Sequence, residues 1–314
     1  MKVGFPQELT HIAWMPLFLQ HVSARVPGMQ WLHAAQKKNI RPSFLEGDVC
    51  FPLKTMIATA LGLLGEADVV LLPRLVLLDG FSMCPNFRGL PDLVALNAKK
   101  MGLDTTSAVA SVVVEAEDRQ DVIQAAGAAA KEIFKQARTS APASLQPENP
   151  AQVSQECATG RAAAAPGQRD LSRTIALIGH PYLLEDARLN NGVPALLRAA
   201  GFDVILCSEL PFDMLSSRAG EYDYYAKKLY FRSAREALGA FLYFSRVSRP
   251  AGIIHLIPFN CGVDALVRIE IESLHKKIDN APPCLVIVCD EHTQHDHVAT
   301  RVEAFLDIVH ATGS

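Results

Sequence analysis

Short apolar runs alternate with longer segments of helical spacing along the whole chain, and this alternation limits the fold more than any other feature. The clearest runs cover residues 69–72, 108–114, 174–178 and 285–288. Continuous apolar runs of this length are typical of strands in sheets that are covered on both faces, and intervening helices favour parallel pairing. The sequence therefore predicts an α/β protein with two Rossmann-like or flavodoxin-like domains, mainly parallel sheets and a cleft between the domains.

A change in composition separates the two predicted domains. Residues 139–173 are dominated by alanine, serine, glutamine and proline and contain few large apolar side chains, which is typical of a linker. The remaining chain divides into an N-terminal α/β domain, 1–138, and a C-terminal α/β domain, 174–314. A chain of 314 residues is long enough for two domains that each bury a core.

Charge and hydropathy exclude two classes of partner. The formal charge is −3 and the basic residues are not clustered, so no nucleic-acid partner is expected. The most apolar region, 55–78, is interrupted by Glu66, Asp68, Pro73 and Arg74, which argues against a membrane span. The N-terminus resembles a first strand more than a signal peptide, so we expect a cytoplasmic protein.

Seven cysteines are present, and their number and spacing do not favour disulfides. An odd count without a secretory signal leaves core packing, metal binding or thiol chemistry. No CxxC pair occurs, which argues against the simplest zinc-ribbon and thioredoxin sites. Cys207, Cys284 and Cys289 lie in or beside apolar strands and are expected in the core, whereas Cys157 lies in the linker.

Cys50, Cys84 and Cys261 differ from the other cysteines because each lies beside proline or glycine, where a regular element begins or ends. Ligands of open α/β sheets bind outside the carboxyl ends of the strands, and the start of a helix favours the thiolate form. Three thiolates suit an iron–sulfur cluster that keeps one iron open for substrate. We therefore predict these three cysteines as ligands, although packing is the usual role of any single cysteine.

A polar segment after the last predicted strand offers further candidates, namely Asp290, Glu291, His292, His295, Asp296 and His297. A zinc or non-haem iron site, a proton relay beside the cluster and a plain helix N-terminus are all consistent with this composition. Glu291 and His292 lie nearest the strand and are predicted as catalytic residues. His295 and His297 are expected to be solvated.

Two functions from different classes follow from these residues. The first is an iron–sulfur redox protein whose open iron binds a substrate carbonyl or hydroxyl, or a small reducible molecule. The second is a metal-free or zinc-stabilised module that binds a small ligand between two lobes. Lys54 and Arg74 supply positive charge near an anionic cluster or substrate, or are ordinary surface charges. The sequence leaves open whether the protein is an enzyme.

Several motifs together resemble the 2-hydroxyacyl-CoA dehydratase and benzoyl-CoA reductase-like family, in particular its activase-related, double-cubane-cluster-like subfamily. The likeness covers most of the chain outside the linker. The motifs are Cys50-Phe-Pro-Leu-Lys54, Leu72-Pro-Arg74, Cys84-Pro85 with Gly89, Gly179-His-Pro-Tyr182 with Asp186 and Asn190, Phe259-Asn-Cys-Gly-Val-Asp264, Asp290-Glu-His-Thr293 and Thr300-Arg-Val-Glu-Ala-Phe305.

The resemblance implies a [4Fe–4S] cluster, or a double-cubane iron–sulfur cluster, held by Cys50, Cys84 and Cys261. It also implies low-potential reduction or dehydration of a small or acyl-CoA substrate, an ATP-dependent activator or reductase as partner, and a homo- or heterodimer. The chain has no Walker-type GxxxxGK[ST] motif, so ATP use would require a separate protein. Asn260 and Val263 stand where the family pattern has glycine and proline, which affects the expected shape of the pocket.

Overall fold

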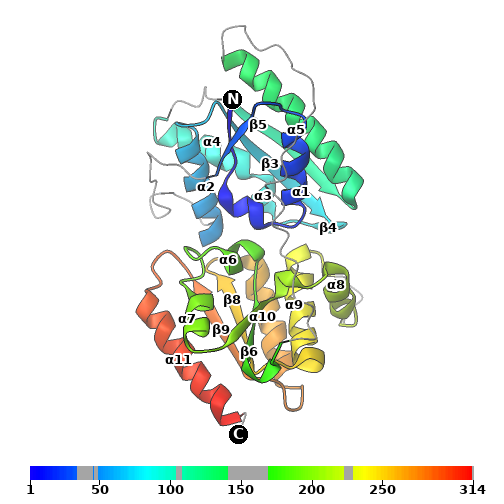
Figure 1. The fold of residues 1–314 in the computed structure, drawn as a ribbon, viewed down its shortest axis with the longest axis vertical. Coiled ribbons are helices and arrows are strands. Elements are labelled where there is room, and N and C mark those ends of the chain that lie inside the picture. Colours follow the sequence, from blue (N-terminus) through cyan, green and yellow to red (C-terminus); the bar gives the residue numbers. More distant parts are fainter. Residues whose placement is uncertain (34–44, 46–48, 104–107, 141–168, 223–228, 313–314) are drawn as a thin grey trace. The chain divides into compact units, whose positions relative to one another are not determined.

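A computed structural model describes residues 1–33, 45, 49–103, 108–140, 169–222 and 229–312. The chain divides into two compact units, Met1–Gly160 and Arg161–Ser314 (Figure 1). Each unit is built on its own mainly parallel sheet, which confirms the predicted fold class. The cleft between the domains stays a prediction. So does the linker at 139–173, because most of it lies outside the described residues.

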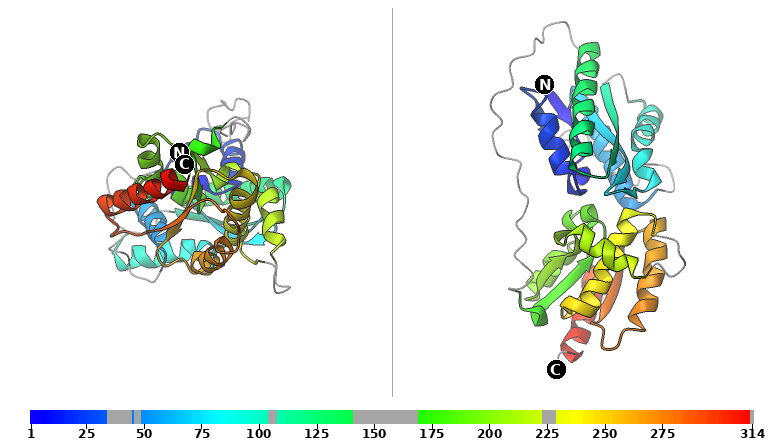
Figure 2. Two further views of the ribbon diagram at one scale, coloured as in Figure 1. Left: turned by 90° about the horizontal axis from the view of Figure 1, so that it is seen from below. Right: turned by 90° about the vertical axis from the view of Figure 1, so that its right-hand side faces the viewer.

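The sheet of the first unit has the strand order β2-β1-β3, with β5 and the short β4 both paired to β3 in the described part. All pairs are parallel except β3 with β4. Helices α1 and α5 pack together, as do α2 and α4 (Figure 2). The elements are β1 (Lys2–Gly4), η1 (Gln7–His11), α1 (Met15–Ser23), β2 (Gln30–Leu32), α2 (Phe51–Leu63), β3 (Val69–Leu78), β4 (Phe81–Ser82), α3 (Pro85–Arg88), α4 (Leu90–Lys100), β5 (Ala108–Ala116) and α5 (Arg119–Ser140).

The sheet of the second unit has the order β7-β6-β8-β9, and every pair is parallel. Helices α9 and α10 pack together, and α7 packs with α11. The elements are η4 (Leu171–Arg173), β6 (Thr174–Ile178), α6 (Pro181–Glu185), α7 (Val193–Ala199), β7 (Asp203–Leu206), η5 (Cys207–Glu209), α8 (Phe212–Gly220), α9 (Arg232–Tyr243), the π-helical turn η6 (Phe244–Ser248), β8 (Gly252–Pro258), α10 (Gly262–His275), β9 (Cys284–Cys289) and α11 (His295–Thr312).

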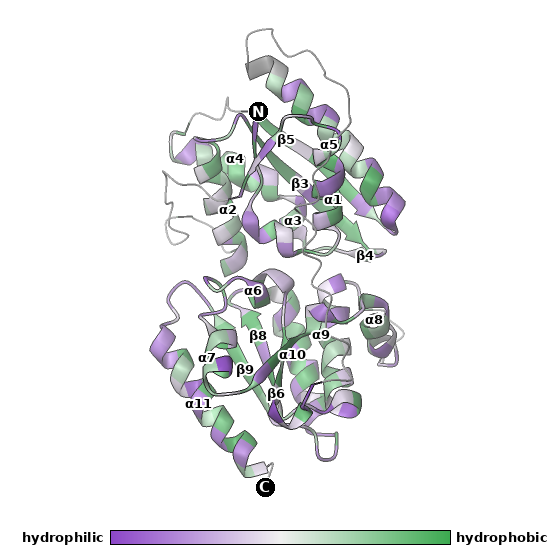
Figure 3. Cartoon of the chain, in the orientation of Figure 1, coloured by the Kyte–Doolittle hydropathy of each residue, from purple (hydrophilic) through white to green (hydrophobic). Residues whose placement is uncertain are grey.

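The apolar runs of the sequence form the central strands. Every residue of β6 and β8 is buried, whereas β7 and β9 at the sheet edges are partly exposed. Figure 3 shows the same pattern, with hydrophobic residues concentrated on the strands. Burial on both faces explains why these runs are continuous instead of alternating.

Helical spacing in the sequence predicts one helix over 190–200 and another over 222–245, and both predictions were wrong in their bounds. The helix predicted over 222–245 begins only at Arg232, and residues 223–228 lie outside the described part of the chain. The helix predicted from Asn190 begins at Val193, because the Asn190 side chain accepts a hydrogen bond from the Gly192 N–H and holds a turn there. At Asn190 a local turn therefore prevails over helical spacing.

Helices α8 and α9 approach each other at Gly239, which has no room for a side chain. A Cβ atom added there would lie 2.0 Å from the backbone oxygen of Leu215. Gly127 in α5 provides a contrast, because its nearest neighbour would be the flexible Arg25 side chain at 3.7 Å.

We expect Gly239→Ala to destabilise the protein by about 1–3 kcal/mol, because one helix must move away from the other. Gly127→Ala is the matched control, and it should stabilise by up to about 1 kcal/mol through helix propensity alone. Chemical denaturation of both variants measures the difference. Equal effects would contradict the close packing at Gly239.

Candidate functional site

The carboxyl ends of β6 and β8 form the switch point of the second sheet, where the chain continues toward opposite edges. Clefts at such points are the usual ligand sites of open α/β sheets. His180 follows β6 directly and is the N-cap residue of α6. Cys261 follows β8 and is the N-cap residue of α10, and Asp264 lies in the first turn of that helix. The topology therefore brings these three side chains to one edge.

The three side chains are in mutual contact. His180 Nε2 lies 3.0 Å from Asp264 Oδ2 and 3.7 Å from Cys261 Sγ. One ligand atom from each residue lies within 4.8 Å of the others. His180 and Asp264 are buried, whereas Cys261 is half-buried. Because one imidazole nitrogen faces both partners, this arrangement is not a nucleophile–base–carboxylate relay, which would use both ring nitrogens.

His180 and Asp264 form a buried ion pair. Burial alone would lower the pKa of His180, because it disfavours the charged imidazolium. The charge of Asp264 and its hydrogen bond outweigh this cost, with a smaller contribution from the Cys261 thiol, and raise the pKa of His180 well above its usual 6.5. Burial also acts to raise the pKa of Asp264, but the charge of His180 reverses that effect and lowers it below 3.8. Each charge is therefore stabilised by the other.

A second histidine in β8, His255, is fully buried, and neither ring nitrogen has a hydrogen-bond partner among the described residues. Burial lowers the pKa of His255 to about 4, so its ring is neutral at physiological pH. His255 is therefore a neutral polar residue within the strand that leads to Cys261.

The backbone at the end of β6 fixes the position of His180. A Cβ atom on Gly179 would lie 2.7 Å from the Leu256 carbonyl oxygen, so only glycine allows β6 and β8 to approach here. The thiol of Cys207 donates to the Gly179 carbonyl at 3.4 Å. The ring of Tyr182 stacks on His180 with centroids 5.0 Å apart. These contacts hold the imidazole from the backbone side and from one face.

The two remaining predicted ligands lie in the first unit. Cys50 is the N-cap residue of α2, and Cys84 is the N-cap residue of α3. After α3 the chain passes through α4 to β5, which is parallel to β3. Both cysteines are outside disulfides and half-buried. Cys261 belongs to the other unit. The three-cysteine ligand set stays a prediction.

The other cysteines are in different surroundings. Cys207 and Cys289 are buried, and burial raises the pKa of both thiols, that of Cys289 to about 12. Burial also raises the pKa of the half-buried Cys284 to about 12. Burial therefore disfavours the thiolate form of these three cysteines. Cys157 lies outside the described residues.

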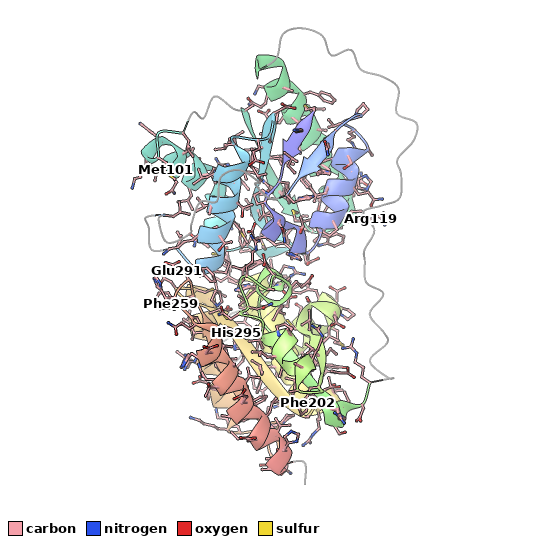
Figure 4. The ribbon with its side chains drawn as sticks, turned by 60° about the vertical axis from the view of Figure 1, so that its left-hand side comes forward. Met101, Arg119, Phe202, Phe259, Glu291 and His295 are labelled. Carbon is pink, nitrogen blue, oxygen red and sulfur yellow. The ribbon has the colours of Figure 1, made fainter. Side chains whose placement is uncertain are left out.

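Glu291 and His292, the predicted catalytic residues, follow β9 and do not join the His180 group. The side chain of Glu291 is mostly covered, while that of His292 is 79% exposed, and the two lie 3.8 Å apart. Figure 4 labels Glu291 together with Phe259, which follows the neighbouring strand β8 at the same edge. The catalytic assignment stays a prediction.

The rest of this polar segment has structural contacts. Asp290 accepts hydrogen bonds from the His292 N–H and the Thr293 hydroxyl, which forms a turn before α11. His295, also labelled in Figure 4, lies 3.0 Å from the Asn191 carbonyl through its Nδ1 atom. His297 is exposed. The segment therefore shows the features of a helix start.

Arg74, a candidate for binding an anion, is engaged elsewhere. Its guanidinium makes two hydrogen bonds to the Asp92 carboxylate, at 2.5 and 2.8 Å. The positive charge is therefore balanced within the first unit.

Sequence reasoning missed the roles of His180 and Asp264, although both were within recognised motifs. His180 and Cys261 occupy equivalent positions, each between the end of a buried strand and the start of a helix, and Asp264 follows Cys261 by three residues. This equivalence is visible in the sequence and could have indicated that the three side chains meet.

The fold and site define an α/β protein of two units with a His–Cys–Asp group at a switch point. A family model described as the CoA enzyme activase uncharacterised domain matches residues 2–210, two thirds of the chain. The chain belongs to this family, which is related to the 2-hydroxyacyl-CoA dehydratase activator family. A search of curated proteins finds no match.

The family match covers the first unit and the beginning of the second. It includes Cys50, Cys84 and His180 and ends before Cys261 and Asp264. In the described part of the chain, no helix is both long and apolar enough to cross a membrane.

We expect Asp264→Asn to destabilise the protein by about 3 kcal/mol, because it leaves His180 buried without its counter-charge. The matched control is Glu272→Gln on the same helix, which breaks the exposed pair with Arg268 and should cost less than about 1 kcal/mol. Chemical denaturation in the presence of a chelator measures both. A loss in Asp264→Asn no larger than in the control would contradict the buried ion pair.

The difference in stability between wild type and Asp264→Asn should depend on pH. The raised pKa of His180 stabilises the fold fully below about pH 6.5, and this stabilisation is lost as the pH rises through the folded value. The lowered pKa of Asp264 stabilises above about pH 3.8, and this is lost as the pH falls through its folded value. The difference should therefore be largest between these two limits, and a difference that grows above pH 6.5 would contradict the assignment.

Proposed function

We propose that this protein is an iron–sulfur redox protein that takes part in the activation or reaction of a CoA-linked enzyme. Cys50, Cys84 and Cys261 hold a [4Fe–4S] or double-cubane cluster with one iron open to a small or CoA-linked substrate. Membership of the CoA enzyme activase family supports the CoA-linked role.

The observation that carries the proposal is the common position of the three cysteines. Each is the N-cap residue of a helix, and each is half-buried and outside a disulfide. The dipole of a long helix favours an anionic group at its start, which applies to Cys50 and Cys261, whose helices have 13 and 14 residues. The donor chemistry therefore fits a cluster, in contrast to the buried thiols of Cys207 and Cys289.

When bound, the cluster supplies one-electron chemistry at low potential. The residues around Cys261 set the charge at that ligand. His180 carries the positive charge nearest to the thiol, and Asp264 keeps that charge in place. Tyr182 covers one face of the imidazole. These residues would position the Cys261 thiolate and compensate its negative charge.

An ATP-dependent activator or reductase is the proposed source of electrons. The sequence has no Walker-type motif, so nucleotide chemistry belongs to the partner. The two proteins would associate at least transiently, and dimer formation belongs to the same proposal.

A second candidate function is a zinc-stabilised module that binds a small ligand. The observation in its favour is the His180–Cys261–Asp264 group, which offers three metal ligands without a contribution from the first unit. The two candidates differ in the metal that the purified protein contains.

Protein purified without oxygen should be brown and contain iron and acid-labile sulfide in equal amounts. Cys50→Ser and Cys84→Ser should each lose most of both, because each removes one cluster ligand. Cys157→Ser and Cys207→Ser are thiol controls and should keep them. Colourless wild-type protein that cannot be reconstituted with iron and sulfide, or full iron in the Cys50 and Cys84 variants, would refute the proposal.

A further inference from the structure

We propose that Cys261, His180 and Asp264 form a binding site for one divalent transition metal ion, occupied when no cluster is bound. The ion is of the type of Zn²⁺ or Fe²⁺. The site lies wholly within the second unit and does not depend on Cys50 or Cys84.

The distances between the ligand atoms fit a single ion. With metal–sulfur and metal–nitrogen bonds of about 2.3 and 2.05 Å, two ligands of a tetrahedral ion lie about 3.6 Å apart. Cys261 Sγ and His180 Nε2 are separated by 3.7 Å, and His180 Nε2 and Asp264 Oδ2 by 3.0 Å. Only small side-chain rotations are needed to place all three atoms around one ion.

The same distances do not fit two ligands of one cluster. Each iron of a [4Fe–4S] cluster takes one protein ligand, so two such ligands sit on different irons and lie further apart than ligands of one ion. His180 is therefore placed to share an ion with Cys261. The thiolate of Cys261 serves either the single ion or the cluster in a given chain.

A buried polar atom points to a missing ligand. Asp264 Oδ2 is buried and accepts no well-aligned hydrogen bond in the described part of the chain, although it lies close to His180. The charge of His180 compensates this carboxylate without a well-aligned hydrogen bond, and a coordinated cation in place of the imidazolium proton would satisfy the same oxygen. A thiolate, a carboxylate and a neutral imidazole together balance a divalent ion.

The surroundings hold the ligands but leave one side open. His180 is fixed by the tight strand contact at Gly179 and by the stacked ring of Tyr182. Cys261 is half-buried, and a Cβ atom on the next residue, Gly262, would meet nothing within 4 Å. Three protein ligands with free space beside one of them is the arrangement of sites that keep a coordination position for water or substrate.

The types of ligand select the class of metal. Thiolate and imidazole favour zinc, iron and cobalt over magnesium and calcium, which prefer oxygen. Co²⁺ is therefore a suitable probe, because its absorption reports thiolate ligation and tetrahedral geometry, and Zn²⁺ should displace it.

The test uses the full-length protein, freed of metal and titrated with Co²⁺ under anaerobic conditions. We expect one Co²⁺ per chain with a thiolate-to-cobalt absorption band that Zn²⁺ abolishes. The double variant Cys50→Ser/Cys84→Ser should bind Co²⁺ as wild type does, although it cannot hold the cluster. His180→Gln and Asp264→Asn should each weaken Co²⁺ binding roughly tenfold or more, since even outer-shell substitutions reach that range.

Cys284→Ser is the matched thiol control in the same unit and should leave the titration unchanged. Circular dichroism of each variant identifies any that do not fold, and iron–sulfur reconstitution of His180→Gln gives a second readout, because this variant should still assemble the cluster. The inference would be overturned by unchanged Co²⁺ affinity in folded His180→Gln, by the absence of a thiolate band in wild type, or by loss of Co²⁺ binding in the Cys50/Cys84 double variant. None of these results depends on whether the iron–sulfur proposal holds.

Discussion

The buried ion pair between His180 and Asp264 is the interaction on which the site depends. Two charges that are separated by 84 positions in the sequence lie 3.0 Å apart at the end of the central strands. Burying either charge alone would cost several kcal/mol, so the pair forms only when β6 and β8 are aligned. The same alignment brings Cys261 to the imidazole, because Cys261 begins the helix that carries Asp264. The alignment of β6 with β8 therefore determines the geometry of the site.

The general fold could be predicted from the sequence because continuous apolar runs have few alternative explanations once helices separate them. Residues 174–178 became β6, and the run that begins at residue 69 became the start of β3. The start of α9 at Arg232 could not be predicted, since the sequence before it keeps helical spacing. The need for glycine at position 239 could not be predicted either, because it arises from tertiary packing against the backbone of Leu215.

The candidate site could be predicted only in part. Pro258, three positions before Cys261, and Gly262, directly after it, marked Cys261 as the start of a helix, which the structure confirms. Its chemical partner His180 lies 81 positions away, and only the parallel pairing of β6 with β8 brings the two together. Glu291 and His292 stood out because their residue types are typical of catalysis, yet residue type alone does not show which side chains meet.

Cys261 links the two metal proposals, since it is a ligand of the cluster and of the single ion. The most direct measurement of the account is therefore the iron, zinc and acid-labile sulfide content of wild type and Cys261→Ser, both purified without oxygen. The account predicts metal in the wild type and almost complete loss of all three in the variant, while circular dichroism stays unchanged. A folded Cys261→Ser variant that keeps the metal content of the wild type would contradict it.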